Sequence, residues 1–240
     1  MDQKQTSKSQ DVEDLTLNLI RSRSMRKTSF RWNLPSQTVY KYLMAMYQSE
    51  VTKCGRKWSD NTILADRIQH LANYLTSEDE RFGFMLLGKP GCGKTTFLRS
   101  FQQLLLLLGQ QPNCEYHYGL KTGIYMRICT ALGYVSFASR SQQFWLTVRA
   151  IRDTELLGID DLGREATDLQ SYGNVTSPIV DLLEYRYSRR LFTAVTTNLS
   201  AKELREKYGD RLVDRFREMF FRVGFNFDSL RKIGQPYGNL

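Results

Sequence analysis

One nine-residue stretch constrains the fold of this chain more than any other feature. It reads G-K-P-G-C-G-K-T-T from Gly88 to Thr96 and follows an apolar run, Phe82 to Leu87, that predicts a buried strand. Its glycines let successive backbone N–H groups converge, and a helix beginning near Lys94 would direct its positive dipole end at the same point. The pattern therefore predicts a strand, a phosphate-binding loop and a helix, in that order.

The side chains of this loop have the chemistry to hold a nucleoside triphosphate with Mg²⁺. Lys94 would reach the β and γ phosphates, and Thr95 would offer its hydroxyl to the metal ion. A chance glycine-rich turn is the alternative, but strand, loop and helix fall where the motif requires them. We therefore expect ATP and Mg²⁺ to be bound by Gly88, Pro90, Gly91, Cys92, Gly93, Lys94, Thr95 and Thr96.

Length and charge limit what else the chain can be. Its 240 residues suffice for one core and a modest appendage, and a formal net charge of +9 favours polyanionic partners such as nucleic acid or acidic protein. The N-terminus lacks an apolar signal core, and the longest leucine run, Leu104 to Leu108, is too short to span a bilayer. We therefore expect a protein that is neither secreted nor membrane-spanning.

The four cysteines are dispersed along the chain, with no C-x-x-C pair. One of them, Cys92, lies within the phosphate loop, so a reducing compartment, the cytoplasm, is expected rather than a disulfide framework. Cys114 and His117 form a C-x-x-H pair, but zinc normally takes four ligands and no second pair lies at a suitable spacing. We expect no structural metal ion.

The first part of the chain is basic. Residues 15–49 contain six cations and no acidic residue, which is typical of a basic arm. Their second half has a helical pattern with Val39, Leu43 and Met46 on one side. That helix could pack on the rest of the chain or dock onto another protein, and the pattern favours neither.

Helices and strands alternate further along the chain. The polar segment from Cys54 to Asp60 is the expected boundary between a helical, partner-binding module at 1–60 and an ATPase domain at 61–240. We expect a helix over Asn61–Leu75, then the strand before the phosphate loop and four more strands: Gly123–Ile128, Thr154–Asp160, Leu191–Thr197 and Arg222–Phe227. Helical patterns between these strands predict an α/β fold with a parallel sheet.

Two carboxylates follow an apolar strand that ends near Ile159. Asp160 would hold Mg²⁺ through water, and Asp161 would orient or deprotonate the water that attacks the γ phosphate. Two acids after a strand also occur as helix caps, but a phosphate loop upstream favours the catalytic role. Many ATPases of this kind have Glu at the second position, and the shorter Asp holds its oxygens further back. Slow hydrolysis is therefore expected.

One amide and two arginines could complete the site. Asn198 follows the next strand, where it would reach the γ phosphate and the water; helix capping is its alternative role, but Ser200 is the better cap. Arg211 and Arg215 are four residues apart, hence on one helix face. Either could be an arginine finger for a neighbouring subunit, which would make hydrolysis depend on assembly. The alternative is an exposed face paired with a nearby acid: Asp210, Asp214 or Glu218.

The order of these motifs resembles the AAA+ ATPases of the DnaC and IstB group. The matching segments span residues 60–231, about 70% of the chain, and read G-K-P-G-C-G-K-T-T, L-L-G-I-D-D-L-G, T-T-N-L-S, G-D-R-L-V-D-R-F and F-D-S-L-R. The resemblance implies a five-stranded parallel sheet in the order 5-1-4-3-2, with Asn198 as sensor 1, Arg215 as the preferred finger and Arg231 as a sensor 2 candidate. Only nine residues follow Arg231, so a separate helical lid is not expected.

A stretch rich in arginine and aromatic residues is a candidate DNA surface. Residues 127–152 contain four arginines, four aromatic residues and no acid. If the stretch ends in a helix, one face carries Trp145, Arg149 and Arg152, which suits stacking on bases and contacting phosphates, with Arg140 just upstream. The alternative is that Trp145 fills a gap between helices and the arginines are solvated. The resemblance favours DNA, because related proteins place a DNA-contacting insertion here.

Together these observations predict an ATP- and Mg²⁺-dependent ATPase that binds DNA, preferably single-stranded, and forms ATP-dependent homo-oligomers. The resemblance implies action on a larger DNA-processing assembly, as a DnaC-type loader of a replicative helicase. An IstB-type ATPase that assists a transposase is the first alternative. An ATP-binding scaffold or signalling module with little turnover is the second, because Asp161 is short and no lid is expected.

Overall fold

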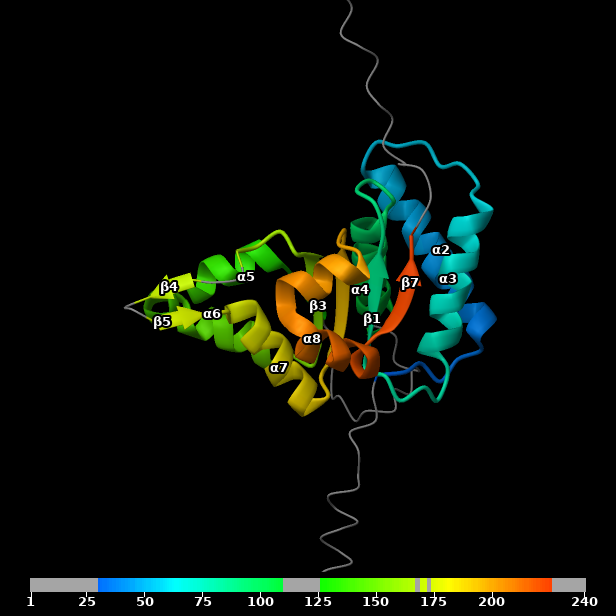
Figure 1. Cartoon of the computed structure of the whole chain (residues 1–240). Helices are drawn as coiled ribbons and strands as arrows, with labels where there is room; N and C mark the ends of the chain where they lie inside the picture. The colour runs from blue at the N-terminus through cyan, green and yellow to red at the C-terminus, as the bar shows by residue number, and fades with distance from the viewer. Residues whose placement is uncertain (1–29, 110–125, 167–168, 172–173, 226–240) are drawn as a thin grey trace, which may run out of the picture.

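The centre of the molecule is a five-stranded parallel sheet, seen in a computed structural model that describes residues 30–109, 126–166, 169–171 and 174–225 (Figure 1). The strands lie in the order β2-β3-β6-β1-β7, with bounds Met126–Thr130, Leu156–Leu162, Phe192–Thr197, Gly83–Leu87 and Phe221–Gly224. Counted along the chain, the five strands are arranged 2-3-4-1-5, which is the predicted order read from the opposite edge. The predicted parallel α/β fold is confirmed.

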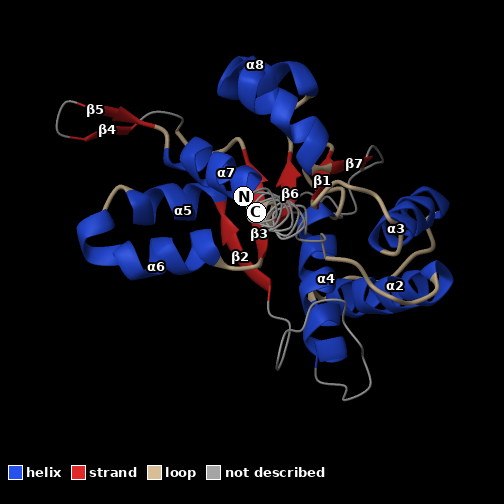
Figure 2. Cartoon of the chain, turned by 90° about the horizontal axis from the view of Figure 1, so that it is seen from below, coloured by secondary structure: helices blue, strands red, loops and turns tan. Residues whose placement is uncertain are grey.

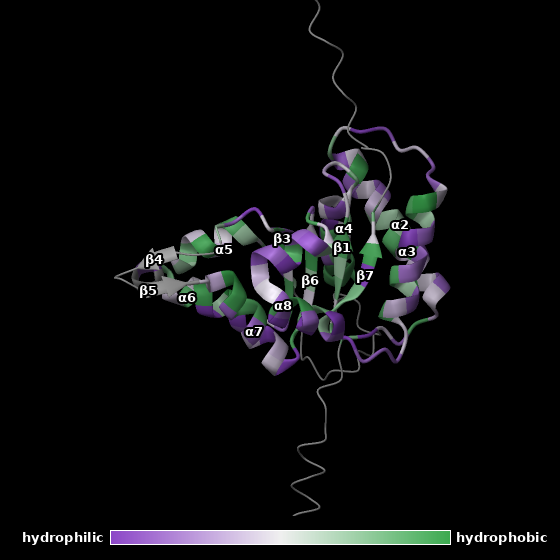
Figure 3. Cartoon of the chain, in the orientation of Figure 1, coloured by the Kyte–Doolittle hydropathy of each residue, from purple (hydrophilic) through white to green (hydrophobic). Residues whose placement is uncertain are grey.

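Both faces of the sheet are covered by helices, which explains why its strands are nearly continuous apolar runs. Phe84 and Leu86 of β1 belong to one hydrophobic cluster, whereas Met85 between them belongs to a second cluster on the opposite face. This alternation is the two-residue period of a strand. Figure 3 shows that the strands are largely apolar, whereas α8 at the surface is largely hydrophilic.

Three helices from the first half of the chain cover one face: α2 (Ser36–Lys53), α3 (Thr62–Leu75) and α4 (Lys94–Gly109). They lie together on one side of the sheet in Figure 2 and share one hydrophobic cluster with it. The side chain of Asn61 caps α3 by accepting from the Leu64 N–H at 2.9 Å. Helix α2 therefore packs on α3 and α4; its docking onto another protein stays a prediction.

The buried stripe of α2 differs slightly from the expected one. Val39 and Leu43 are fully buried as predicted, but Tyr47 rather than Met46 completes the stripe. The Tyr47 ring meets Trp58 edge to face, with centroids 6.1 Å apart. The Tyr47 ring is thus part of the hydrophobic core. Its burial raises the pKa of the phenol, because burial disfavours the charged form.

Four helices cover the other face: α5 (Ala131–Ala138), α6 (Ser141–Asp153), α7 (Pro178–Arg189) and α8 (Ala201–Met219). Helix α8 begins with a capping box in which Ser200 and Glu203 satisfy each other's backbone N–H groups, as expected for the better cap. Its first half ends at Gly209, which breaks the helix with φ 80° and ψ 159°. The Cβ of any other residue would meet no steric clash there, so the backbone conformation is what favours glycine.

A buried arginine joins the helices of the second face to the sheet. Arg186 of α7 is completely buried and donates to the Thr193 hydroxyl and to the backbone carbonyls of Arg152, Thr154, Glu155 and Phe192. These acceptors belong to the end of α6, the start of β3 and the start of β6. Burial lowers the pKa of the Arg186 guanidinium to about 9, which leaves it charged at neutral pH.

A short antiparallel hairpin, β4 (Leu169–Ser171) with β5 (Asn174–Thr176), was not anticipated. Its strands are three residues long and carry no hydrophobic alternation, so the sequence has no strand signal to read. In Figure 1 the hairpin lies beside α5 and α6 at the end of the molecule farthest from α2 and α3. The end of the last expected strand, residues 226–227, lies outside the described residues.

Candidate nucleotide-binding site

The phosphate loop connects β1 to α4. Gly91 and Gly93 have φ values of 90° and 87°, which residues with a side chain rarely adopt. Gly88 is constrained by space: a Cβ there would lie 2.3 Å from the carbonyl oxygen of Phe225. Cys92 between the later glycines is fully buried in the cluster beneath the loop. Backbone freedom, close approach and burial thus account for the glycine and cysteine positions of the motif.

The side chain of Lys94 folds back over this loop. Its Nζ donates to the carbonyl oxygens of Gly88 at 2.7 Å and Lys89 at 2.8 Å, and to Oδ1 of Asn198 at 2.8 Å. Lys94 is buried, so the ammonium is held by hydrogen bonds rather than by bulk water. The structure therefore brings together two predicted site residues that are far apart in the sequence.

A bulge in β3 directs two carboxylates to the same edge of the sheet. The register of β3 against β6 shifts there, so that Asp160 and Asp161 together oppose Thr196. Asp161 has a φ of 57°, a left-handed conformation that Asp tolerates better than most residues. Its backbone N–H donates to the Thr196 hydroxyl at 2.9 Å, so β6 holds the bulge in place.

Asp160 is oriented by two hydroxyl groups. Its Oδ1 accepts from Thr95 Oγ1 at 3.0 Å and from Thr196 Oγ1 at 2.6 Å. The carboxylate is buried, and these donors satisfy part of its hydrogen-bonding capacity. Thr95 and Asp160, the two residues predicted to hold Mg²⁺, are therefore adjacent, whereas the part played by Thr196 was not foreseen.

The second carboxylate is paired with an arginine. Oδ2 of Asp161 lies 3.0 Å from Nη1 of Arg164, three residues later. The Asp161 side chain is 28% exposed and that of Arg164 is 68% exposed, so the pair lies at the rim of the site. Arg164 had no assigned role in the sequence, although its position just after D-D-L-G was a usable signal.

The loop that carries this pair is braced by α8. The buried Glu165 carboxylate accepts from the Gly163 N–H at 2.9 Å and from the hydroxyl of Tyr208, while Lys207 donates to the backbone carbonyls of Gly163 and Glu165 at 2.9 and 2.6 Å. Burial, followed by the bond to Glu165, raises the pKa of Tyr208. The loop after β3 is thus positioned from both β6 and α8.

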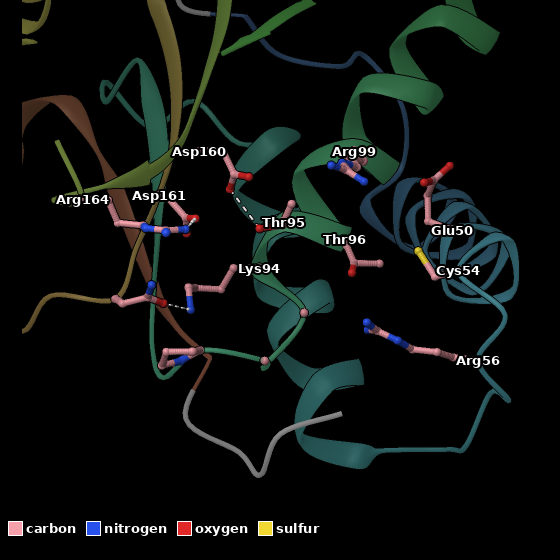
Figure 4. Close-up of a pocket in the computed structure, with 14 residues that line it drawn as sticks. Glu50, Cys54, Arg56, Lys94, Thr95, Thr96, Arg99, Asp160, Asp161 and Arg164 are labelled. Carbon is pink, nitrogen blue, oxygen red and sulfur yellow. Dashed lines mark hydrogen bonds and ion pairs between the residues drawn. The ribbon is translucent and has the colours of Figure 1, made fainter. Parts of the chain in front are cut away.

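These groups line one cavity of about 620 Å³ (Figure 4). At one end are Lys94, Asp160, Asp161, Arg164 and Asn198; at the other are four residues without an assigned role, Glu50, Cys54, Arg56 and Arg99. Arg99 comes from α4, one turn after the loop, and Glu50 from the last turn of α2. No local pattern marks these four residues, because the packing of α2 against α4 is what brings them to the cavity.

The residues present fit a magnesium nucleotide. The volume is within the usual range of small-molecule sites, about 300–1,000 Å³. One end combines an ammonium with glycine-rich backbone at the start of a helix, which suits phosphate. Beside it, a hydroxyl and a carboxylate 3.0 Å apart are the oxygen ligands that Mg²⁺ prefers. The chemistry at this end of the cavity is therefore that of a triphosphate with a hard cation.

Comparison with known proteins gives matches only in structure. By sequence, the chain matches no protein-family model and no curated protein. The crystal structure of DnaI is 19% identical, with a TM-score of 0.51 over 72% of this chain and 86% of that one. The chain therefore shares the fold of that structure. The crystal structure of the DnaC helicase loader is also similar, with 18% identity and a TM-score of 0.49 over 70% of this chain and 93% of that one. The structure of AMPPCP-bound DnaA from Aquifex aeolicus has 15% identity and a TM-score of 0.46 over 70% of this chain and 47% of that one.

The two arginines predicted as finger candidates lie outside the cavity. Arg215 of α8 has Nη1 2.5 Å from Oε1 of Glu184 on α7, and its guanidinium lies over the Tyr187 ring at 5.0 Å. Arg211 lies 3.9 Å from the same carboxylate and is 79% exposed. The partner is Glu184 rather than an acid of α8, because the packing of α7 against α8 places that carboxylate between both arginines.

The arginine and aromatic stretch runs from β2 through α5 and most of α6. Helical geometry is interrupted at Phe144, and the helix continues through Trp145, Arg149 and Arg152 on one face. Trp145 is 53% exposed rather than filling a gap. Arg140 is exposed just before α6.

These arginines are not free cations. Asp153, one residue beyond the acid-free stretch, lies 2.9 Å from Nε of Arg152 and 3.5 Å from Nε of Arg149. The Arg152 guanidinium also lies 4.4 Å over the Tyr185 ring. The hydrogen bond from Arg152, with a further one from Tyr185, lowers the pKa of Asp153 to about 2. The surface therefore carries less net positive charge than the stretch alone suggested.

Several predictions fall on residues 1–29, 110–125 and 226–240, outside the described residues. They concern residues 15–29 of the basic arm, the Cys114–His117 pair, and Arg231 with the absence of a lid. Within the described ranges, no helix combines the length and apolar character needed to cross a membrane.

Proposed function

We propose that the chain is an ATP-dependent, DNA-binding AAA+ ATPase that acts as a DnaC-type loader of a replicative helicase in the cytoplasm. The observation that carries the ATPase part is the meeting of Lys94, Asp160 and Asn198 around one cavity. Lys94 is the first residue of α4, directly after the phosphate loop; Asp160 lies near the carboxyl end of β3, and Asn198 directly follows β6. The carboxyl ends of parallel strands are where α/β proteins bind ligands.

Binding follows from the charges at the phosphate end. The loop N–H groups and the Lys94 ammonium would hold the triphosphate, with Nζ exchanging carbonyl partners for phosphate oxygens. Thr95 and Asp160 would hold Mg²⁺, which neutralises charge on the phosphate oxygens when bound. Thr196 keeps Asp160 oriented through its 2.6 Å hydrogen bond.

Hydrolysis would depend on Asp161 and Asn198. Asp161 follows the predicted metal ligand directly, where its carboxylate can accept a proton from water rather than coordinate the metal. Asn198 can orient the same water through its side-chain amide while Oδ1 holds Lys94. Because the Asp161 side chain is short and holds its oxygens further back, turnover of the isolated subunit is expected to be slow.

Assembly would supply the missing cation. Arg215 is held at the surface between α7 and α8, away from its own cavity, so it could act only on a neighbour's nucleotide. A guanidinium added in this way neutralises charge on the γ phosphoryl group. Homo-oligomers formed with ATP would therefore hydrolyse faster than monomers, with Arg211 as the second candidate.

The proposed binding of DNA is based on the surface of α6, and the proposed binding of a helicase on the N-terminal segment. Trp145 and the arginines Arg149 and Arg152 would stack on bases and contact phosphates of single-stranded DNA. Residues 1–60 would select the client.

The decisive experiment is an ATPase and nucleotide-binding assay with and without single-stranded DNA. Lys94→Ala should abolish both binding and turnover, whereas Asp161→Asn should keep binding and lose turnover. Lys202→Ala is the matched control, since Lys202 is an exposed lysine of α8. Binding without turnover in every condition would favour the scaffold or signalling role instead.

A second experiment addresses the client. The full chain, with ATP, is mixed separately with a purified replicative helicase and with a transposase from the same source. Complex formation and deposition of the helicase on single-stranded DNA would support a loader. Complex formation with the transposase alone would replace that role by the IstB-type one.

A further inference from the structure

We propose that Arg164 is a γ-phosphate-reading residue that exchanges partners: it pairs with Asp161 when no triphosphate is bound and moves to the γ phosphate when one is. The inference rests on the proposed ATP site. Arg164 lines the cavity together with Lys94, Asp161 and Asn198, and its Nη1 lies 3.0 Å from Asp161 Oδ2. In Figure 4 its side chain lies along Asp161 on the Lys94 side of the site.

The backbone that carries Arg164 is fixed, whereas its side chain is not enclosed. Thr197 Oγ1 donates to the Leu162 carbonyl at 2.7 Å, and Lys207 donates to the carbonyls on both sides of Arg164. The side chain itself is 68% exposed. An exposed pair of this kind contributes little stability, so a change of partner costs little.

Charge makes the γ phosphate a strong competitor for this arginine. A guanidinium has five N–H donors in a planar fork, and the bond to Asp161 uses one of them, at Nη1. A phosphoryl group offers several oxygens and more negative charge than a carboxylate, so it can engage the fork at two points. A diphosphate lacks the group that competes, so the exchange would respond to ATP and not to ADP.

The exchange has a consequence for hydrolysis. While Arg164 holds Oδ2, the Asp161 carboxylate is committed to an ion pair and that oxygen is not free to contact the attacking water. When Arg164 moves to the γ phosphate, the carboxylate is released at the moment when the nucleotide is in place. Arg164 thereby couples the presence of a triphosphate to the availability of the base.

Nucleotide affinity tests this without relying on turnover. Dissociation constants are measured by calorimetry with Mg²⁺ for ADP and for the non-hydrolysable analogue adenosine 5′-[β,γ-imido]triphosphate. The variants are Arg164→Ala, Asp161→Asn and the double variant. Arg217→Ala is the matched control, because Arg217 and Asp214 form an exposed pair of the same spacing and the same 3.0 Å distance on α8.

Exchange predicts a particular pattern of affinities. Arg164→Ala should weaken the triphosphate analogue about three- to tenfold and change ADP less than about twofold. Asp161→Asn should tighten the analogue because the competing carboxylate is gone, and this gain should vanish when Arg164 is also removed. Arg217→Ala should change neither ligand.

Three results would overturn the exchange. Equal weakening of both ligands by Arg164→Ala would mean a general charge effect, and no weakening would mean that Arg164 does not touch the nucleotide. A gain from Asp161→Asn that persists without Arg164 would mean simple relief of repulsion. Wild-type protein that binds neither ligand would instead refute the proposed nucleotide site.

Discussion

The cavity at the phosphate loop and the outer surface of α6 both carry charged groups, but those groups are held in different ways. Around the cavity, Asp160 is buried and oriented by hydroxyls from α4 and β6, and Lys94 is held by the loop and by Asn198. On α6, Arg149 and Arg152 share one exposed acid in their own helix. Positions at the cavity are thus set by packed elements, whereas those on α6 are set by local pairs that solvent screens.

This contrast separates two kinds of recognition. Transferring a phosphoryl group requires groups held in one geometry, which only well-packed elements provide. Binding a flexible polyanion requires charge that can adjust along the strand, which exposed side chains provide. Substitutions should accordingly have large and specific effects at the cavity and small, salt-dependent effects on α6.

The largest effect is expected for Arg215→Ala, which tests whether assembly completes the cavity. Hydrolysis by the oligomer should fall by about a thousandfold, while ATP affinity of the monomer should be kept. Arg211→Ala is the comparison, since Arg211 shares Glu184 but is far more exposed. A monomer that already hydrolyses ATP at the full oligomer rate would show that neither arginine is a finger.

Thr196→Val should have the next largest effect, because it removes the hydroxyl that orients Asp160 and caps the Asp161 N–H. We expect kcat/KM to fall about tenfold and stability to fall by about 1–3 kcal/mol. Steady-state kinetics and chemical denaturation measure the two effects separately.

Thr193→Val on the same strand is the control for Thr196→Val. Thr193 is also buried and hydrogen-bonded, but its partner is Arg186 at the other end of β6. The Thr193→Val variant should lose about as much stability as Thr196→Val but keep the kcat/KM of the wild type. Equal activity losses in both variants would mean that β6 affects the site only through stability.

Reversing the charges of Arg149 and Arg152 together should have a smaller effect, confined to DNA. Affinity for single-stranded DNA should fall about tenfold at low salt, and the salt dependence should become flatter. Fluorescence anisotropy over a series of salt concentrations measures both. Reversal of Arg205 and Arg217, exposed and acid-paired on α8, is the control. Unchanged affinity would leave the α6 arginines as solvated surface.

The smallest effect is expected for Asp153→Asn, which removes the acid that pairs with Arg149 and Arg152 on α6. The hydrogen bond from Arg152 keeps the pKa of Asp153 near 2, so at neutral pH its carboxylate offsets the two arginines. Removing that charge should tighten DNA binding about two- to threefold. The gain should disappear when Arg149 and Arg152 are reversed; a gain that survives would place the DNA elsewhere.

Much of the fold was predictable because its signals are local. Apolar runs ended by polar residues predicted every strand of the main sheet. Apolar spacing predicted α3, and Ser200 marked the start of α8 through its capping chemistry. The boundaries of the strands differ from the expected ones by a few residues. For example, β3 was expected to end at Asp160, but it continues through the bulge to Leu162. The hairpin was missed because its strands are short and lack alternation.

The site was predictable only in part. Lys94, Thr95, Asp160, Asp161 and Asn198 were identified because each lies in a motif at a strand end. The side of the cavity formed by α2 was not identified, because it depends on how α2 packs against α4. Likewise the partner of Arg215 lies 31 residues away in the sequence, on a different helix.

Two properties were present in the order of residues alone: a glycine-rich loop between a strand and a helix, and acids and an amide at later strand ends. These are local because backbone conformation and hydrophobic period act over a few residues. Which groups meet was decided by the packed fold: Lys94 with Asn198, Glu184 with Arg215, and α2 with the cavity. Coulombic and hydrogen-bond partners are chosen by distance in space, and only packing brings separate segments within a few ångströms.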